Sequence, residues 1–196
     1  MNLRFLGDAL DYWKGAILSD LRAEDLLTNL RVDRMASDQW QPADLALFAH
    51  LLRIKENGLI SHRYRLLQQR EKYFAEISAD GDLFLDPDTG IQTSAVKHIE
   101  QYLKPSELLQ ILEAKKDRLV AVYQHVSRVR TRRRVERILS ILESEKKSDF
   151  FCVSYESGTV ALLFFSYKRE RIEGVRNYLC SLLKVHATHR IGCWIR

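Results

Sequence analysis

The stretch Gly81-Asp-Leu-Phe-Leu-Asp-Pro-Asp-Thr-Gly-Ile91 is a short apolar run that ends in two acids on either side of a proline. An apolar run of this length, bounded by turn residues, predicts a buried strand over Leu83–Asp86. In an open α/β sheet, ligands bind outside the carboxyl ends of the strands. Asp86 and Asp88 therefore follow a predicted strand at the place where such sheets bind ligands.

The segments after this strand alternate between helix and strand patterns. Helical patterns cover 105–116, 128–144 and 168–184, and strand patterns cover 118–125, 150–155, 159–166 and 190–196. Helices between strands make parallel crossovers that cover both faces of a sheet, whereas a short turn between strands makes an antiparallel hairpin. The order predicts a Rossmann-like, doubly wound α/β sheet, mostly parallel, with an antiparallel C-terminal hairpin.

The first eighty residues are more helical than the rest. Apolar spacing predicts a helix over 8–22 with Asp8 as its cap, a helix from Pro42 to about Glu56-Asn57-Gly58, and a helix over 62–77. The segment 30–35 is the strand candidate of this part. We expect one α/β domain over residues 1–196, with a helical part at 1–80 and strand–helix alternation over 81–196.

Composition restricts the class of protein. With 46% hydrophobic and 29% charged residues among 196, the chain can bury a sizeable core. Three cysteines without a CxxC pair indicate a reducing, cytoplasmic environment. Since no apolar run approaches about 20 residues, we expect no membrane partner.

The positive charge is concentrated in one segment. The net charge is +5, and six arginines fall within ten residues: Arg128, Arg130, Arg132, Arg133, Arg134 and Arg137. Arginine clusters bind phosphate backbones without regard to sequence. We expect nucleic acid as the partner, although acids later in the same helix make a solvated helix the alternative.

The acids at the strand tip suggest a cation site. Carboxylate oxygens are ligands for Mg²⁺. Asp38 follows the candidate strand at 30–35, and if that strand lies beside the one ending at Asp86, then Asp38, Asp86 and Asp88 converge and hold Mg²⁺ or Mn²⁺. The alternative is an ordinary Asp-Pro-Asp-Thr-Gly turn, in which the aspartates bond to backbone amides.

Other side chains could complete such a site. His125 ends the neighbouring predicted strand and could handle a proton near neutral pH, or could cap the next helix. Lys14 lies on one helical face with Asp8 and Asp11, which indicates either a functional role or a solvent-facing stripe of ion pairs. We expect Lys14 or His125 to handle protons or charge.

Phosphate contacts are expected from basic side chains near these strand ends. Arg128, Arg130 and Arg132 are the expected contacts to the nucleic-acid backbone, since arginine can hold a phosphate through two parallel hydrogen bonds. Lys97 is a further candidate, with a solvated loop lysine as the alternative.

Three segments together resemble a family of bacterial proteins without an assigned activity. They are Phe5-Leu-Gly-Asp-Ala-Leu-Asp-Tyr-Trp-Lys14, Phe84-Leu-Asp-Pro-Asp-Thr-Gly-Ile91 and Val122-Tyr-Gln-His-Val-Ser-Arg128. The family carries a GDxxDxxK opening, a DPDxG strand tip and a Y-[QH]-H-x-x-R strand end. The resemblance covers most of the chain and implies no reaction.

The layout from Leu83 onward also resembles Rossmann-like ribosomal RNA adenine methyltransferases. Asp86-Pro87 matches the first half of their D-P-P-Y tip, and Lys14 matches a lysine in their leading helix. The resemblance implies S-adenosylmethionine as cofactor and RNA or DNA as substrate. Asp88-Thr89 replaces the Pro-Tyr, and 35–40 lacks the glycine that lets the backbone approach the cofactor.

Three functions follow from these patterns. The first is a nucleic-acid-directed enzyme, a metal-dependent nuclease or phosphodiesterase built on the acidic strand tip. The second is an S-adenosylmethionine-dependent, or degenerate, methyltransferase-like protein. The third is a non-enzymatic interaction module in which the acids have only a structural role.

Overall fold

Six strands form one mixed sheet in the order β1-β2-β5-β7-β6-β8. In this computed structural model, which describes residues 2–77, 80–126 and 130–194, the strands are β1 (Arg31–Asp33), β2 (Leu83–Leu85), β5 (Val120–His125), β6 (Phe151–Ser157), β7 (Val160–Ser166) and β8 (Ile191–Trp194). β1, β2 and β5 are parallel, and β7, β6 and β8 continue the sheet in antiparallel pairs. The predicted α/β class is confirmed. The prediction that this sheet is mostly parallel is wrong, because three of its five pairings are antiparallel: β7 pairs with β5 as well as with β6, and β8 pairs with β6.

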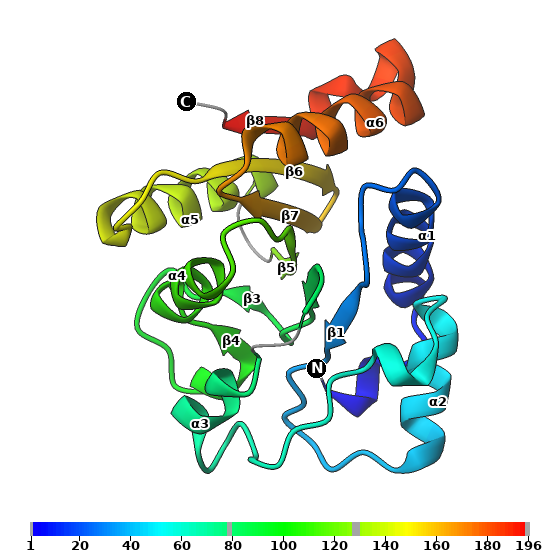
Figure 1. Cartoon of the computed structure of the whole chain (residues 1–196), viewed down its shortest axis with the longest axis vertical. Coiled ribbons are helices and arrows are strands. Elements are labelled where there is room, and N and C mark those ends of the chain that lie inside the picture. The colour runs from blue at the N-terminus through cyan, green and yellow to red at the C-terminus, as the bar shows by residue number, and fades with distance from the viewer. Residues whose placement is uncertain (1, 78–79, 127–129, 195–196) are drawn as a thin grey trace.

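Helices cover both faces of the sheet. They are α1 (Ala9–Ala23), α2 (Pro42–Leu51), α3 (Arg70–Ala75), α4 (Pro105–Ala114), α5 (Thr131–Glu145) and α6 (Arg169–Ala187), and the 3-10 turns are η1 (Leu3–Phe5), η2 (Glu56–Gly58), η3 (Ile99–Gln101) and η4 (Thr188–Arg190). In Figure 1, α1 and α2 lie to the right of the sheet, and α4 and α5 lie to the left. This two-sided cover explains why the central strands are apolar at nearly every position.

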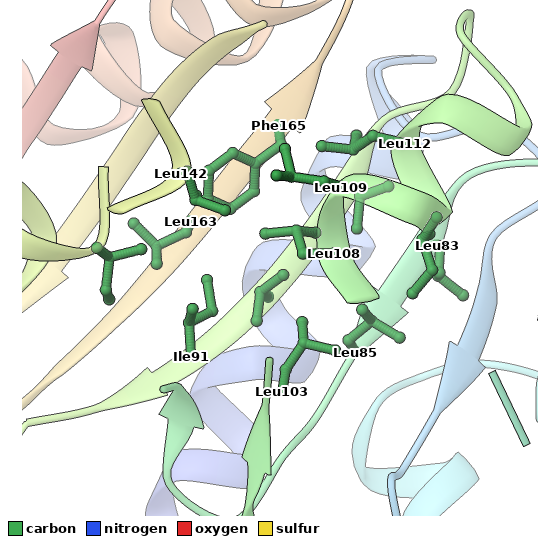
Figure 2. Close-up of a cluster of buried hydrophobic side chains, with 14 of the residues drawn as sticks. Leu83, Leu85, Ile91, Leu103, Leu108, Leu109, Leu112, Leu142, Leu163 and Phe165 are labelled. Carbon is green, nitrogen blue, oxygen red and sulfur yellow. The ribbon is translucent and has the colours of Figure 1, made fainter. Parts of the chain in front are cut away.

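The two faces bury different sets of side chains because successive residues of a strand point to opposite faces. Leu83 and Leu85 of β2 belong to the cluster beneath α3, α4 and α5, which Figure 2 shows in part. Phe84, between them, packs with α1, α2 and α6 on the other face. β7 continues both clusters, with all seven of its residues buried.

A glycine lets α1 and α2 pack closely. A Cβ on Gly15 would lie 2.0 Å from the Leu51 carbonyl oxygen, which is too close for any side chain at this position. Lys14, the residue before Gly15, is buried as well. The predicted cap of α1 is confirmed, since the Asp8 side chain accepts hydrogen bonds from the amides of Leu10 and Asp11.

The helix predicted over 62–77 is wrong in its first half. The helix α3 begins only at Arg70. Long-range contacts hold the preceding segment instead: the Arg63 amide donates to Glu76 Oε2 at 3.0 Å, and His62 Nε2 lies 3.2 Å from Asp33 Oδ2. Leu67 is 60% exposed, whereas Leu66 is buried. Tertiary contacts therefore outweighed the helical spacing.

A second, two-stranded sheet was not predicted. β3 (Gly90–Ile91) pairs in parallel with β4 (Tyr102–Leu103), directly after the acidic strand tip. Each strand has only two residues, which is too short for a periodic pattern.

Within the described ranges, we find no helix with the length and apolar character that a bilayer crossing requires.

Candidate active site

The strand tip is held by its neighbours on both sides. After β2, the Asp86 amide donates to the Asp33 carbonyl of β1 at 2.9 Å. The Thr89 carbonyl accepts from the His125 amide of β5 at 2.9 Å. The turn over Asp86, Pro87 and Asp88 is therefore fixed between two parallel strands, at the carboxyl edge where α/β sheets bind ligands.

A buried glutamine fixes the glycine of the turn. Gln124 accepts a hydrogen bond from the Ile91 amide at 2.7 Å and donates to the Thr89 carbonyl at 3.0 Å. Gly90 lies against this side chain with a φ of +119°, a conformation that favours glycine. A Cβ at this position would lie 2.3 Å from Gln124 Oε1. The glycine of the motif is thus required by both its backbone angle and its surroundings.

Lys14 joins two aspartates beneath the turn. Its ammonium lies 2.9 Å from Asp86 Oδ2, 3.1 Å from Asp86 Oδ1 and 2.7 Å from Asp11 Oδ1. The Lys14 side chain is 4% exposed and both carboxylates are buried. The ammonium also lies 4.5 Å from the centre of the Tyr123 ring. The expected face of Asp8, Asp11 and Lys14 therefore points partly into the protein, and we call Asp11, Lys14 and Asp86 the lysine cluster.

The charges of the lysine cluster do not balance. Burial alone would lower the pKa of Lys14, but attraction to Asp86 and Asp11 outweighs burial and raises the pKa above its usual value. Burial raises the pKa of the Asp86 carboxyl, and the attraction of Lys14 opposes that rise. Lys14 therefore remains an ammonium at neutral pH and cannot act as a base. One ammonium compensates two carboxylates, which leaves an excess of negative charge.

A pocket of about 350 Å³ opens above the lysine cluster. We call it the acidic pocket, and its lining consists of Asn2, Phe5, Asp8, Leu10, Asp11, Lys14, Asp86, Pro87, Asp88, Thr89, Gln101, Tyr123 and His125. Four aspartates face one lysine in this lining. Phe5 and Tyr123 add aromatic surface, and burial raises the pKa of the Tyr123 hydroxyl, which keeps it protonated. The pocket can attract a cation or a group that donates hydrogen bonds.

Four of the predicted site residues line this pocket together, namely Lys14, Asp86, Asp88 and His125. Asp88 Oδ2 accepts a hydrogen bond from the Ser37 hydroxyl at 2.9 Å. Asp38 lines a different pocket, and its carboxylate accepts from the Leu3 amide at 2.9 Å. The adjacency of β1 and β2 was predicted correctly, but it does not bring Asp38 to the acidic pocket.

The four basic residues predicted to contact phosphate are not gathered at one place in the described structure. Arg128 lies outside the described residues. Arg130 is exposed and immediately precedes α5. Arg132 forms an ion pair with Glu156 at 3.0 Å and lies over the Trp194 ring, so its charge is already partly used. Lys97 is exposed and does not line the acidic pocket.

The start of α5 lies near the strand tip. Arg134 donates a hydrogen bond to Thr93, which follows β3 by two residues. The Thr131 hydroxyl donates to the Gly158 carbonyl in the turn between β6 and β7. These contacts hold the basic end of the helix at the same edge of the sheet as Asp86 and Asp88.

The residues present can be compared with the needs of a metal ion. Within the described ranges, no three His, Cys, Asp or Glu side chains form a group that could hold a metal. Magnesium usually keeps several waters and takes only one or two protein carboxylates, together with phosphate oxygens of a substrate. Asp86 and Asp88, both in the acidic pocket, meet that smaller requirement. The donor set therefore fits a water-rich magnesium site better than a closed protein cage.

Two further members of the site were not assigned a task of their own. Asp11 was considered only together with Asp8 and Lys14, as a helical face with either a functional role or a solvent-facing stripe of ion pairs, and Tyr123 only as part of a strand and of the bacterial family's motif. The spacing of Asp11 and Lys14, three residues apart on one helix, was the signal for a shared face. The sequence contains no signal for the contact between Lys14 and Tyr123, since it depends on how α1 docks on the sheet.

Comparison with known proteins adds little. Searches with protein-family models and among curated proteins find no match to this chain. A crystal structure of a DUF519-family protein from Legionella pneumophila is similar with a TM-score of 0.39 and 12% identity, over 80% of this chain and 57% of that one. The chain thus spans little more than half the length of that protein. A likeness at this level supports no conclusion about fold or function.

Proposed function

We propose that the protein is a nucleic-acid-directed, metal-dependent phosphodiesterase whose reaction takes place in the acidic pocket. One observation carries this proposal: four aspartates and one lysine line a pocket at the carboxyl edge of a basic protein. A phosphate diester is an anion and is repelled by such a lining. A divalent cation bound to Asp86 and Asp88 would remove this conflict and, when bound, would activate water and polarise the phosphate.

The protein's own side chains have distinct tasks in this proposal. Lys14 orients Asp86 and favours its ionised form against the effect of burial, and does not itself exchange a proton. His125, at the end of β5 and in the pocket lining, is the group that accepts a proton from the attacking water. Arg130, exposed before α5, contacts the phosphates of the bound strand outside the pocket. Cytoplasmic nucleic acid is the expected substrate.

The test uses the full chain with single- and double-stranded DNA and RNA, in Mg²⁺, Mn²⁺ or a chelator. We expect metal-dependent cleavage that falls by about a hundredfold or more in Asp88→Asn. Asp80→Asn is the matched control, because Asp80 is exposed, lines neither this pocket nor the one that contains Asp38, and should leave the rate unchanged. Cleavage that persists in a chelator, or that Asp88→Asn and Asp86→Asn leave unaltered, would sink the proposal.

A methyltransferase-like function is the second candidate. The observation in its favour is the strand arrangement, three parallel strands followed by the inserted hairpin strand β7 and then β6, with Asp86-Pro87 at a strand tip. A carboxylate at this tip could accept hydrogen bonds from the amino group of a nucleobase. Calorimetry with S-adenosylmethionine distinguishes the two: saturable heat supports this candidate, and no heat at millimolar concentration excludes an active enzyme.

An interaction module is the remaining possibility from the sequence, and the same experiments address it. A ligand that binds only the folded chain at about 100 times its dissociation constant stabilises it by roughly 2.7 kcal/mol. If Mg²⁺, Mn²⁺, S-adenosylmethionine and oligonucleotides all leave the melting temperature unchanged, the aspartates are structural and both enzymatic proposals fail.

A further inference from the structure

A second pocket, of about 280 Å³, lies at the carboxyl end of β1. We call it the cationic pocket; the side chains that matter here are Arg34, Trp40, His62, Tyr64, Arg65 and Tyr73. Its two arginines face a single acid, Asp38, which already accepts the Leu3 amide. Its charge is therefore opposite to that of the acidic pocket, and aromatic rings make up much of its wall.

A buried network holds one wall of the cationic pocket. Asp33 is fully buried and accepts hydrogen bonds from the Tyr73 hydroxyl at 2.5 Å and the Met35 amide at 2.9 Å. His62 Nε2 lies 3.2 Å from the other Asp33 oxygen, and the His62 and Tyr73 rings stack with their centres 3.7 Å apart. Burial would raise the pKa of Asp33, but these partners outweigh it and lower the pKa, so the carboxylate stays ionised and holds both rings.

Other lining residues of the pocket supply cations and a further ring. The Arg34 guanidinium lies 5.4 Å from the centre of the Trp40 ring, and Nη1 donates to the Ile60 carbonyl. Arg65 is exposed, and in the described part of the chain no carboxylate forms an ion pair with it. The buried indole N–H of Trp40 has no acceptor among the described residues. The pocket thus presents hydrogen-bond donors and cations, and a complementary ligand is an anion that carries hydrogen-bond acceptors.

The two pockets are neighbours. Ser37 lines the cationic pocket, Asp88 lines the acidic pocket, and the hydrogen bond between their side chains joins the two linings. A ligand in one pocket therefore lies next to whatever occupies the other. The positive lining disfavours S-adenosylmethionine here, because its sulfonium would face two arginines.

We propose that the cationic pocket binds a nucleoside monophosphate unit, with the base against the aromatic rings and the phosphate on Arg65 and Arg34. Aromatic rings stack on the face of any base, and arginine can hold a phosphate through paired hydrogen bonds. The unit is either a free nucleotide or one residue of a nucleic-acid strand. This assignment goes beyond the phosphodiesterase proposal and is independent of it, because binding here needs neither a metal nor turnover.

The test is isothermal titration calorimetry on the full chain in a metal chelator. The probes are each of the four ribonucleoside 5′-monophosphates, the nucleosides without phosphate, inorganic phosphate, and a single-stranded decanucleotide. We expect saturable binding of at least one monophosphate, and weaker binding by about tenfold or more in Arg65→Gln, because a hydrogen bond to a charged group is lost. Arg63→Gln is the matched control: Arg63 is two residues away, is 90% exposed and lies outside this pocket.

The outcomes answer two separate questions: whether the site exists, and whether its ligand is a free nucleotide or a residue of a strand. A decanucleotide that binds more tightly than the monophosphates, with the same dependence on Arg65, identifies a strand residue; equal affinities identify a free nucleotide. Binding that is unchanged in Arg65→Gln overturns the proposal. Three other results also overturn it. Inorganic phosphate binds as tightly as the nucleotides, or the nucleosides bind as tightly as their monophosphates, or no probe gives a heat of binding.

A second variant tests recognition of the base. Trp40→Leu should weaken monophosphate binding and leave the weak binding of inorganic phosphate unchanged, because the ring contacts only the base. Trp40 also packs against Phe48, with ring centres 5.3 Å apart, so the melting temperature of this variant is measured alongside. If the Trp40→Leu protein is folded and binds the monophosphate with unchanged affinity, the proposed role of this ring is wrong. If Arg65→Gln also leaves the affinity unchanged, the whole assignment is wrong.

Discussion

Replacing Lys14 with methionine tests the lysine cluster directly. Methionine keeps the unbranched shape and most of the volume of the side chain but removes the ammonium. Asp11 and Asp86 then lose the cation at 2.7 and 2.9 Å, while their side chains remain only 1% exposed in the lining of the acidic pocket. Asp11 retains its hydrogen bond from the Gly7 amide, while Asp86 loses both of its contacts with the ammonium.

The size of the effect follows from this burial. Removing one partner of a buried ion pair costs about 3–5 kcal/mol, because it leaves an uncompensated charge in a poorly solvated place. Domains unfold with a total free energy of about 5–15 kcal/mol, so Lys14→Met should consume a large part of the stability. The Tyr123 ring also loses its cation contact, which adds a smaller term.

The cost should depend on pH, with a sign that can be worked out. In the native protein the pKa of Lys14 is raised, so its contribution is complete near neutral pH and on the alkaline side is lost only when pH rises through that folded pKa. In Lys14→Met, the largest influence that opposes burial is gone, so the pKa of Asp86 rises further and folding favours the protonated acid. The variant is therefore least unstable in acid, and the difference from the native protein shrinks as pH falls from 7 toward about 4.

Urea unfolding at pH 7 and at lower pH measures these differences. Lys97→Met is the matched control, since Lys97 is exposed and should change the unfolding free energy by less than about 0.5 kcal/mol. Lys14→Met with Asp86→Asn should recover part of the loss, because one of the two uncompensated charges is gone. A loss below about 1 kcal/mol for Lys14→Met, or a loss that grows in acid, would refute the buried lysine cluster.

Two further substitutions test the surroundings of the site. Gly90→Ala should lower the unfolding free energy by about 3 kcal/mol or more, because a residue with a side chain resists a φ of +119° and its Cβ displaces the hydrogen-bonded Gln124. Gly158→Ala is the control: Gly158 has a φ of +60° and no atom within 4 Å of an added Cβ, so the loss should be only about 1–2 kcal/mol. Equal melting temperatures for the two variants would contradict this account. Asp82→Asn should lower the unfolding free energy by about 2–4 kcal/mol, since the buried carboxylate accepts the Thr28 and Leu119 amides and pairs with Arg171 at 2.5 Å. The same change at the exposed Asp80 is the control, and a result as small as that of Asp80→Asn would show that the Arg171 pair is not essential.

Much of the secondary structure could be predicted because it depends on near neighbours in the chain. Pro105 at the start of α4 and the apolar run of β5 each act within a few residues, and both elements formed where predicted. The strand tip at Asp86 was also predicted, since an apolar run followed by turn residues determines where a strand ends. The α/β class followed from the order of these elements.

The segment 62–69 shows where local pattern was not enough. Its apolar spacing predicted helix, yet His62 lies against Asp33 and the Arg63 amide bonds to Glu76. These partners are distant in sequence, so no local window could include them. Asp38 is a related case: β1 and β2 are neighbours as expected, but the loop after β1 bonds back to Leu3. Strand adjacency limits where a loop begins and does not determine where its side chains go.

The sequence alone determined most of the helices and strands, their apolar faces, and the presence of acids and a lysine near the carboxyl edge of a sheet, but not the short pair β3 and β4 or the segment before α3. Only the tertiary structure decided which of them meet. Lys14 and Asp86 are 72 residues apart, and their contact depends on the docking of α1 against the sheet, where Gly15 allows α2 to approach. Periodicity arises from the geometry of one element, whereas the partner of a buried charge is selected by the packing of several elements at once.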